Sequence, residues 1–308
     1  QEVSSGNLEQ RLDIYTRSEE VRNLTNAFRK MTRDLRMQME ELRYTTSMQQ
    51  RLEGELAAAR SIQMSMMTRR FPAFPDRKEV DIHAIVKPAR AVGGDFYDFY
   101  FIDSDCLCLL IGDVAGKGVP AALFMAVSKT LLKANAAHAS SPADMLAKVN
   151  EELCAESSGG MFVSLVLALL NVRTGEVEVC NAGHPAPLRI TPDHRVDALS
   201  GHSGIALGAW RGLPYQSVRH KLEPGDTLVF YTDGITEALS PEEQFYSAAR
   251  LQRVLEPMAG KSAEQITRTV VQDVRAFGAE HEQADDLTLL TVRWLGATQT
   301  PSATLTPN

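Results

Sequence analysis

The N-terminal quarter of the chain carries a long seven-residue hydrophobic repeat. Across residues 21–66, mostly apolar residues recur at alternating steps of three and four, with charged residues between them. A narrow seam sustained over many turns favours a coiled coil over a lone surface helix, which would show a wider apolar face. Polar residues interrupt the seam at Gln38, Thr45, Gln49 and Gln63, so we expect a weak coil that can respond to a signal. An amphipathic helix folded back on the rest of the chain is the alternative interpretation.

Two prolines, Pro72 and Pro75, end this helix, because each disfavours the helical conformation of the residue before it. Beyond them, the pattern of apolar positions predicts strands at 80–86, 97–102, 106–111, 162–172, 177–181, 218–222, 227–232 and 287–294, with short strands near Leu188 and Ile205. It predicts helices at 120–137, 145–155, 247–256 and 263–277. Strands follow one another in hairpin-like succession and helices come in pairs, unlike a parallel doubly wound protein. We therefore expect an α+β fold of antiparallel sheet layers covered by helices.

Composition narrows the class of protein. The 308 residues are 44% hydrophobic and 23% charged, which is enough to bury a large core. A net charge of -7 without a stripe of basic residues argues against a nucleic-acid partner. The four cysteines form no CxxC pair, so we expect free thiols in a reducing, cytoplasmic setting. No apolar run approaches the ~20 residues that a membrane span needs, and we expect the chain as given to be soluble.

Acidic residues recur where predicted strands begin or end. They are Asp95 after two glycines, Asp113 in GDVAGKG, Asp233 in YTDGITEA, and Asp285 with Asp286 in ADDLTLL. One such acid is usually a turn former, because Asp bonds readily to its own backbone. Several carboxylates in one place are costly unless a cation neutralises them, and oxygen ligands suit hard cations such as Mg²⁺ or Mn²⁺. The residues themselves therefore predict a metal-assisted hydrolase.

Six motifs carry a resemblance to a known family. GGDFYD, GDVAGKGVPAAL, FVSLVLALLN, TGEVEVCNAGHPAPL, YTDGITEA and DDLTLL occur in this order, and residues 80–294 resemble the PPM-type metal-dependent serine/threonine phosphatases of the SpoIIE/RsbU branch. The resemblance implies an αββα sandwich of two antiparallel sheets with two Mn²⁺ or Mg²⁺ ions at the sheet edges. It implies as ligands Asp95 and the Val114 carbonyl for one ion, Asp233 and Asp285 for the other, and Asp113 as the bridge, with Asp286 as an alternative to Asp285. The implied reaction is hydrolysis of phosphoserine or phosphothreonine through the bound ions and water. The implied substrate is a small phosphorylated, STAS-like antagonist protein of a partner-switching pathway.

The start of the chain resembles the second half of a HAMP signalling module, on Gly6-Asn7-Leu8 and residues 18–31. This resemblance implies the cytoplasmic portion of an inner-membrane receptor, with membrane contact only through a missing upstream segment. The expected organisation is a HAMP-like part at 1–40, a coiled-coil linker at 41–70, a phosphatase domain at 78–296 and a flexible tail at 297–308. We further expect the N-terminal helix to form a homodimer that regulates the enzyme.

Two other functions and two individual residues have alternative interpretations. The GGD turn of a nucleotide cyclase would place Glu after the Asp, whereas Phe96 follows Asp95 here. A non-enzymatic scaffold with a degenerate phosphatase domain would have lost at least one metal acid, and all are present. Asp98 could bind an ion or water, or simply accept hydrogen bonds at a strand start. For His184, a structural hydrogen bond is favoured over proton donation.

Overall fold

The computed structural model describes residues 19–156, 160–199, 201–279, 283 and 285–297. The chain divides into two compact units, residues 1–59 and 60–308. The first unit contains most of α1 (Glu19–Ser65), a 47-residue helix that confirms the predicted one. Residues 1–18 of the HAMP-like segment lie outside the described residues. None of the described helices combines the length and apolar character needed to cross a membrane.

The apolar seam of α1 faces outward in the first unit. Leu24, Leu42 and Leu52 are 72%, 67% and 57% exposed, respectively. A row of exposed leucines on a long helix is typical of a surface that packs against another helix.

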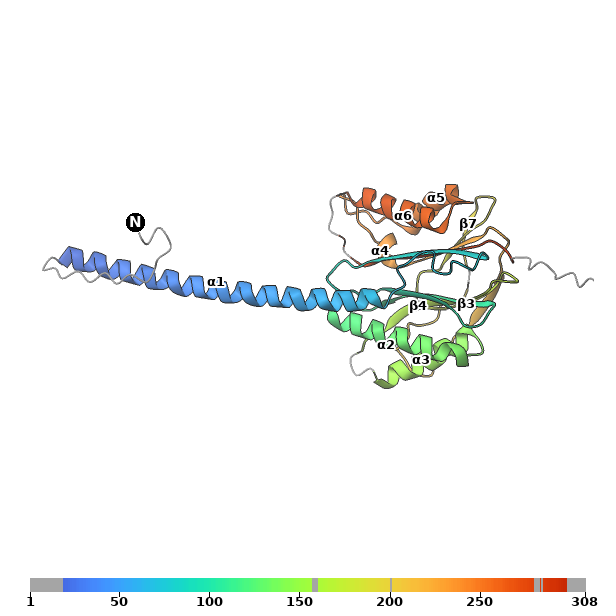
Figure 1. Ribbon diagram of the computed structural model, residues 1–308, viewed down its shortest axis with the longest axis horizontal. Coiled ribbons are helices and arrows are strands. Elements are labelled where there is room, and N and C mark those ends of the chain that lie inside the picture. Colours follow the sequence, from blue (N-terminus) through green and yellow to red (C-terminus); the bar gives the residue numbers. More distant parts are fainter. Residues whose placement is uncertain (1–18, 157–159, 200, 280–282, 284, 298–308) are drawn as a thin grey trace, which may run out of the picture. The chain divides into compact units, whose positions relative to one another are not determined.

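The second unit is built on two five-stranded antiparallel sheets that face each other (Figure 1). One has the order β1-β10-β9-β6-β7 and contains β1 (Val80–Lys87), β6 (Leu188–Ile190), β7 (Val196–Ala198), β9 (Thr227–Tyr231) and β10 (Leu287–Trp294). The other has the order β2-β3-β4-β5-β8 and contains β2 (Phe96–Phe101), β3 (Cys106–Val114), β4 (Val163–Asn171), β5 (Glu176–Ala182) and β8 (Ser217–Lys221). The pairs β2-β3, β3-β4, β4-β5, β6-β7 and β9-β10 join strands that are neighbours along the chain, as the hairpin-like succession predicted.

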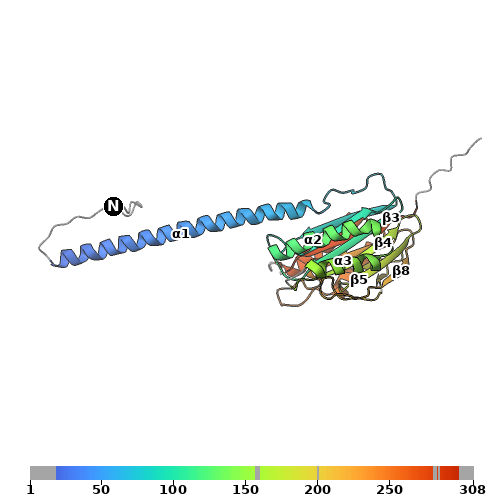
Figure 2. The same ribbon diagram turned by 90° about the horizontal axis from the view of Figure 1, so that it is seen from below.

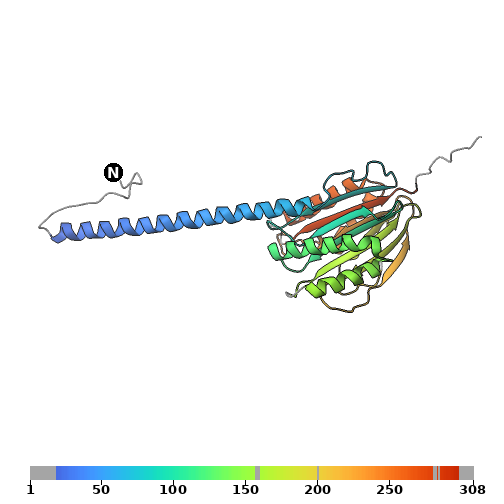
Figure 3. The same ribbon diagram turned by 60° about the horizontal axis from the view of Figure 1, so that its bottom comes forward.

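Paired helices cover the outer face of each sheet. On the sheet that contains β3 lie α2 (Val119–Asn135), η2 (Ala136–His138) and α3 (Pro142–Glu156), as Figures 2 and 3 show. On the sheet that contains β10 lie α5 (Ala248–Leu255), η3 (Glu256–Met258) and α6 (Ala263–Gly278), at the top of Figure 1. The short α4 (Asp233–Thr236) follows β9. The αββα sandwich implied by the family resemblance is confirmed.

Burial follows from these layers. β3 is buried along almost its whole length, because one face meets the other sheet and the opposite face meets α2. β1 shows the alternation expected of a strand with one face in the core, with Val80, Ile82, Ala84 and Val86 buried.

The segment between α1 and β1 also packs into the second unit. Met67 is buried, and the rings of Phe71 and Phe74 lie 6.0 and 5.8 Å from that of Phe99. The compact unit therefore begins at Arg60, ahead of the expected domain start at residue 78.

Two local predictions were wrong, and two short elements were not predicted. β3 continues past Ile111 to Val114, so Asp113 lies inside a strand and not in the loop after it. Pairing with β4 extends the strand, because Asp113 and Val114 stand opposite Ser164 and Val163. Ile205 is not part of a strand, and its side chain is exposed. The short elements β7 and α4 had too few residues to show a period in the sequence.

Candidate metal centre

Asp95 and Asp113 lie beside each other at one end of the second sheet. The register of β2 and β3 pairs Phe96 with Gly112, which makes Asp95 and Asp113 the next pair outward. Asp95 is buried, with 3% of its surface exposed, whereas Asp113 is half-buried.

Asp233 and Asp285 come from the other sheet, at the same end of the sandwich. Asp233 is the first residue of α4, two residues after the end of β9, and Asp285 precedes β10. These two strands are neighbours, with Tyr231 opposite Leu289. Because β9 runs toward this end and β10 starts from it, the two acids meet there.

Two hydrogen bonds join the sheets at this end. The Thr232 hydroxyl donates to Oδ2 of Asp95 over 2.7 Å. The Gly94 N–H donates to Oδ2 of Asp286 over 2.9 Å. The acids of one sheet are therefore held against the acids of the other.

The carboxylates raise one another's pKa. Burial holds the pKa of Asp95 well above its ordinary value, and the charge of Asp113 raises it further. Burial, and then the charge of Asp233, raise the pKa of Asp113 to about 7. The pKa of Asp233 is raised by burial first and by the charge of Asp285 second. Nearby positive charge would reverse the effect, because it favours the ionised form of every one of these groups.

The donor set fits small hard cations. In the part of the chain that the structure describes, no three His, Cys, Asp or Glu side chains converge closely enough to hold an ion by themselves. Mg²⁺ does not require this, since it usually takes one or two carboxylates and keeps several waters. The carbonyl oxygen of Val114 adds a backbone ligand atom to the site. It lies 2.7 Å from where a Cβ on Gly94, the residue before Asp95, would stand. Carboxylates, one carbonyl and water together make a suitable site.

Asp286 holds the loops of this centre together. Its carboxylate accepts hydrogen bonds from the backbone N–H groups of Ala89 and Gly94, over 2.8 and 2.9 Å. A Cβ on Gly93 would lie 1.7 Å from Oδ2 of Asp286, and one on Gly234 would lie 1.9 Å from its carbonyl oxygen. Gly93 and Gly234 therefore allow the close approach of Asp286. Since both Asp286 oxygens accept backbone hydrogen bonds, Asp285 is the better candidate ligand of the two.

Lys117 contacts the centre from the loop after β3. Its Nζ lies 3.0 Å from Oδ2 of Asp285, and the two side chains are 41% and 45% exposed. The ion pair neutralises part of the charge of Asp285. Because both side chains are partly exposed, solvent weakens their attraction. This lysine therefore belongs to the centre, and is more than a solvated side chain.

Neither His184 nor Cys154 is set up as a nucleophile or general base. Burial lowers the pKa of His184 to about 4, and its ring nitrogens bond to Ser164 Oγ at 2.8 Å and to the Tyr231 carbonyl at 3.1 Å. His184 thus links β4 to β9, which confirms its predicted structural role. Burial raises the pKa of the Cys154 thiol, which keeps it protonated and unreactive.

Asp98 forms a buried ion pair that the sequence did not reveal. Its partner is Lys129 of α2, and both residues are less than 9% exposed. Lys129 also donates to the Tyr97 carbonyl over 3.3 Å. The pair fixes α2 against β2, three residues beyond Asp95. The available signal was a lysine on the apolar face of a helix, in step with Met125 and Leu132.

Gln63 is a second residue whose role the sequence concealed. It is 5% exposed, and its side-chain amide bonds to both backbone groups of Gly93. The seven-residue repeat assigned Gln63 to the coiled-coil seam, but in the structure it packs inside the second unit. This glutamine is therefore part of the support for the GGD loop.

Comparison with known proteins places the chain in a family. A family model described as stage II sporulation protein E (SpoIIE) matches residues 103–295, more than half of the chain. The chain belongs to the SpoIIE family. It is 27% identical to phosphoserine phosphatase RsbU of Bacillus subtilis over 258 residues, covering 83% of this chain and 75% of RsbU. It is also 27% identical to protein IcfG of Synechocystis sp. over 325 residues, covering 95% of this chain but only about half (49%) of IcfG.

The solved structures agree at the level of the fold. The SiaA-PP2C domain of Pseudomonas aeruginosa superposes with a TM-score of 0.72 at 22% identity, over 80% of this chain and 98% of that one. The second unit thus has the fold of that PP2C domain.

Proposed function

We propose that the chain is a metal-dependent protein phosphatase that hydrolyses phosphoserine or phosphothreonine. The observation that carries this proposal is the meeting of carboxylates from two different sheets at one end of the sandwich, where burial and mutual charge raise their pKa values. A PP2C-type domain in which all of these acids are present has the groups needed to bind divalent cations.

The proposed ligands follow from where the acids lie. The charge of Asp113 acts on Asp95 of its own sheet, and the charge of Asp233 from the other sheet acts on Asp113, so we assign Asp113 to bridge two Mn²⁺ or Mg²⁺ ions. Asp95 and the Val114 carbonyl would hold one ion, and Asp233 and Asp285 the other. When bound, two such ions activate a water and neutralise the phosphoryl oxygens during in-line displacement.

The chain's own residues position these donors. The Thr232 hydroxyl fixes one oxygen of Asp95, and the Asp286 carboxylate fixes the backbone of the loop that precedes it. Neither Cys154 nor His184 offers a side-chain nucleophile, so we propose direct attack by water without a phosphoenzyme.

The substrate is proposed from the relatives. RsbU is described as a phosphoserine phosphatase, and it matches most of this chain. We therefore propose that the natural substrate is a small phosphorylated antagonist protein, STAS-like in fold, in a bacterial partner-switching pathway.

Regulation is proposed to come through α1. The exposed leucines of the seam suit pairing with the same helix of a second chain, which would make a homodimer. The last turns of α1 contain Gln63, whose amide bonds to the GGD loop. A change in the coil would therefore act on the backbone next to Asp95.

The test is metal-dependent turnover. The purified chain should hydrolyse p-nitrophenyl phosphate and a phosphoserine peptide with Mn²⁺ or Mg²⁺, and excess EDTA should abolish both activities. Asp113→Asn should lower kcat/KM at least about 100-fold, since it removes the bridging charge while leaving the fold intact. Circular dichroism of the variant controls for folding.

A non-enzymatic scaffold is the competing function. It predicts no turnover with any divalent cation and no difference between the wild-type chain and Asp113→Asn. Full activity in excess EDTA would instead show that the reaction does not use the carboxylate centre.

A further inference from the structure

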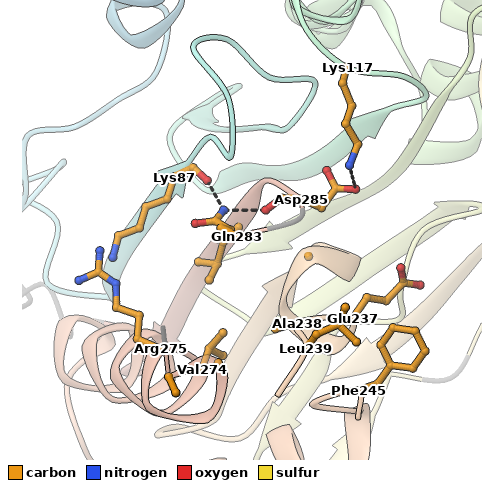
Figure 4. Close-up of a pocket in the computed structure, with 14 residues that line it drawn as sticks. Lys87, Lys117, Glu237, Ala238, Leu239, Phe245, Val274, Arg275, Gln283 and Asp285 are labelled. Atoms are coloured by element: carbon orange, nitrogen blue, oxygen red, sulfur yellow. Dashed lines mark hydrogen bonds and ion pairs between the residues drawn. The ribbon is translucent and has the colours of Figure 1, made fainter. Parts of the chain in front are cut away.

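A pocket of about 590 Å³ opens beside the candidate metal centre (Figure 4). Asp285 and Gly234 contribute to it from the centre, and the pocket extends from them toward the C-terminal half of α6. We call it the flank pocket, and the side chains that matter for its chemistry are Lys87, Arg275, Val274, Leu239, Phe245 and Glu237. Its position next to the proposed site of phosphate hydrolysis makes it accessible to the residues that flank a phosphoserine.

One wall of the flank pocket is cationic. Lys87 ends β1 and Arg275 lies near the end of α6, and Figure 4 shows the tips of their side chains side by side. Within the described residues, neither side chain forms an ion pair. Glu237 stands across the pocket from them, next to Phe245 (Figure 4). The wall therefore presents two neighbouring positive charges.

Two adjacent cations are unfavourable unless an anion lies between them. Burial lowers the pKa of the Lys87 ammonium, and the charge of Arg275 lowers it further. A carboxylate held by both side chains would remove this repulsion, and a guanidinium can donate two parallel hydrogen bonds to its oxygens. The wall thus matches a carboxylate in charge and in hydrogen-bonding geometry.

Apolar side chains form another part of the lining. Val274 and Leu239 line the pocket, and Phe245, at its edge, is 63% exposed. Such a surface can cover the methylene groups of a side chain whose charged end reaches the cationic wall. A glutamate has this form, with two methylenes and a terminal carboxylate.

We propose that the flank pocket binds an acidic side chain of the phosphoprotein substrate, a glutamate close in sequence to the phosphoserine. The inference rests on the proposed phosphatase function and adds the substrate feature that the enzyme selects. Lys87 and Arg275 bind the carboxylate, and the apolar side chains bind its stem. The metal centre acts on the phosphate group, and the flank pocket selects the sequence around it.

The experiment compares phosphoserine peptides of one alanine-based sequence. One glutamate is moved through each of the positions from four before to four after the phosphoserine, and kcat/KM is measured for every peptide against the all-alanine parent. At one or two positions, glutamate should raise kcat/KM about five- to tenfold, as expected of a partly screened charge pair, and lysine at the same position should lower it. For each enzyme variant, kcat/KM for the glutamate peptide is divided by kcat/KM for the all-alanine parent, and we call this quotient the glutamate ratio. A general loss of activity in a variant cancels in this ratio.

The variants locate the preference. Lys87→Met and Arg275→Met should each reduce the glutamate ratio, and the double variant should bring it near one. Arg275→Glu should reverse it in favour of lysine. Arg268→Met removes a cation from the same helix outside the pocket, where the side chain is 70% exposed, and should keep the wild-type ratio.

The outcomes separate this inference from the proposed function. If every peptide is hydrolysed in a metal-dependent manner but glutamate has no effect at any position, the pocket does not select an acid and the phosphatase function stands. If a preference exists but survives in the Lys87→Met, Arg275→Met double variant, the acid binds elsewhere. If no phosphate ester is turned over with any divalent cation, the proposed function fails, and the inference with it.

Discussion

The side-chain amide of Gln63 bonds to Gly93 in both directions. Its Nε2 donates to the Gly93 carbonyl over 2.6 Å, and its Oε1 accepts from the Gly93 N–H over 3.3 Å. Gln63 lies in the last turn of α1, and Gly93 is two residues before Asp95. An amide that satisfies both backbone groups holds the loop as a neighbouring strand would. The Gln63–Gly93 contact and two peptide bonds therefore connect the end of α1 to Asp95, a proposed metal ligand.

Removal of this contact should reduce both the stability and the activity of the protein. Gln63→Ala leaves both backbone groups of Gly93 without their partner, which costs about 1–3 kcal/mol when the site is buried. We expect kcat/KM to fall about tenfold and the Mn²⁺ concentration for half-maximal activity to rise, because the loop that carries Asp95 is less well fixed. Titration of activity with Mn²⁺ measures both effects. Arg60→Ala, an exposed change one turn earlier, is the control. An unchanged Mn²⁺ titration in Gln63→Ala would show that the loop does not depend on α1.

A methyl group on Gly94 should damage the centre directly. The Cβ of Gly94→Ala would lie 2.7 Å from the Val114 carbonyl oxygen, so either the GGD loop or that carbonyl must move. We expect turnover of p-nitrophenyl phosphate to fall at least about 100-fold, since the move displaces a proposed ligand. Gly54→Ala is the matched control, because nothing lies within 4 Å of its Cβ and alanine favours the helix by about 1 kcal/mol. Equal activity in the two variants would contradict the assignment of Val114.

His184 should make the protein sensitive to acid. Its pKa is about 4 in the folded protein, because of burial, against an ordinary value of 6.5. The unfolded chain therefore binds a proton at a higher pH than the folded protein does. The contribution of neutral His184 to the free energy of unfolding is complete above pH 6.5. As the pH falls from 6.5 toward 4, this contribution is lost, and the free energy of unfolding drops by about 3 kcal/mol in total.

Urea unfolding at pH 7 and pH 5 tests this with the wild-type chain and His184→Gln. The free energy of unfolding should fall more in the wild-type chain, because the variant has no proton to take up at this position. The comparison is needed because the raised pKa values of Asp95 and Asp113 change stability in the opposite direction. His202→Gln, an exposed histidine, should follow the wild type. If His184→Gln shows the same loss as the wild type, this histidine does not set the acid sensitivity.

The seam of α1 should hold a dimer. Leu52 is 57% exposed on the helix, and Leu52→Asp would put a charge in the middle of the proposed interface. Light scattering should show a dimer for the wild-type chain at micromolar concentration and a larger monomer fraction for Leu52→Asp, with a changed specific activity. Gln50→Asp adds the same charge outside the seam and should remain dimeric. A monomeric wild-type chain would rule out this mode of regulation.

The sequence by itself determined most of the elements and their order. The seven-residue repeat of α1, the alternating burial of β1 and the uninterrupted apolar run of β3 are local patterns, because each depends on the period of a single helix or strand. The hairpin-like succession of strands predicted antiparallel sheets, and the recurring acids predicted that the chemistry would lie at strand ends. Local periodicity carries no information about contacts between elements. The sequence pattern therefore assigned Gln63 to the coiled coil and ended β3 before Asp113.

The tertiary structure decided how the acids are divided between metal ligands and structural supports. Asp285 and Asp286 are neighbours in sequence with the same side chain, yet the carboxylate of one pairs with Lys117 while that of the other accepts backbone hydrogen bonds from a loop about 190 residues earlier. The Asp98–Lys129 pair and the close approach of Gly93 to Asp286 likewise join segments far apart in the chain. The physical reason is that hydrogen bonds, burial and charge act between groups that are close in space, and which groups are close depends on strand register and on how the two sheets pack.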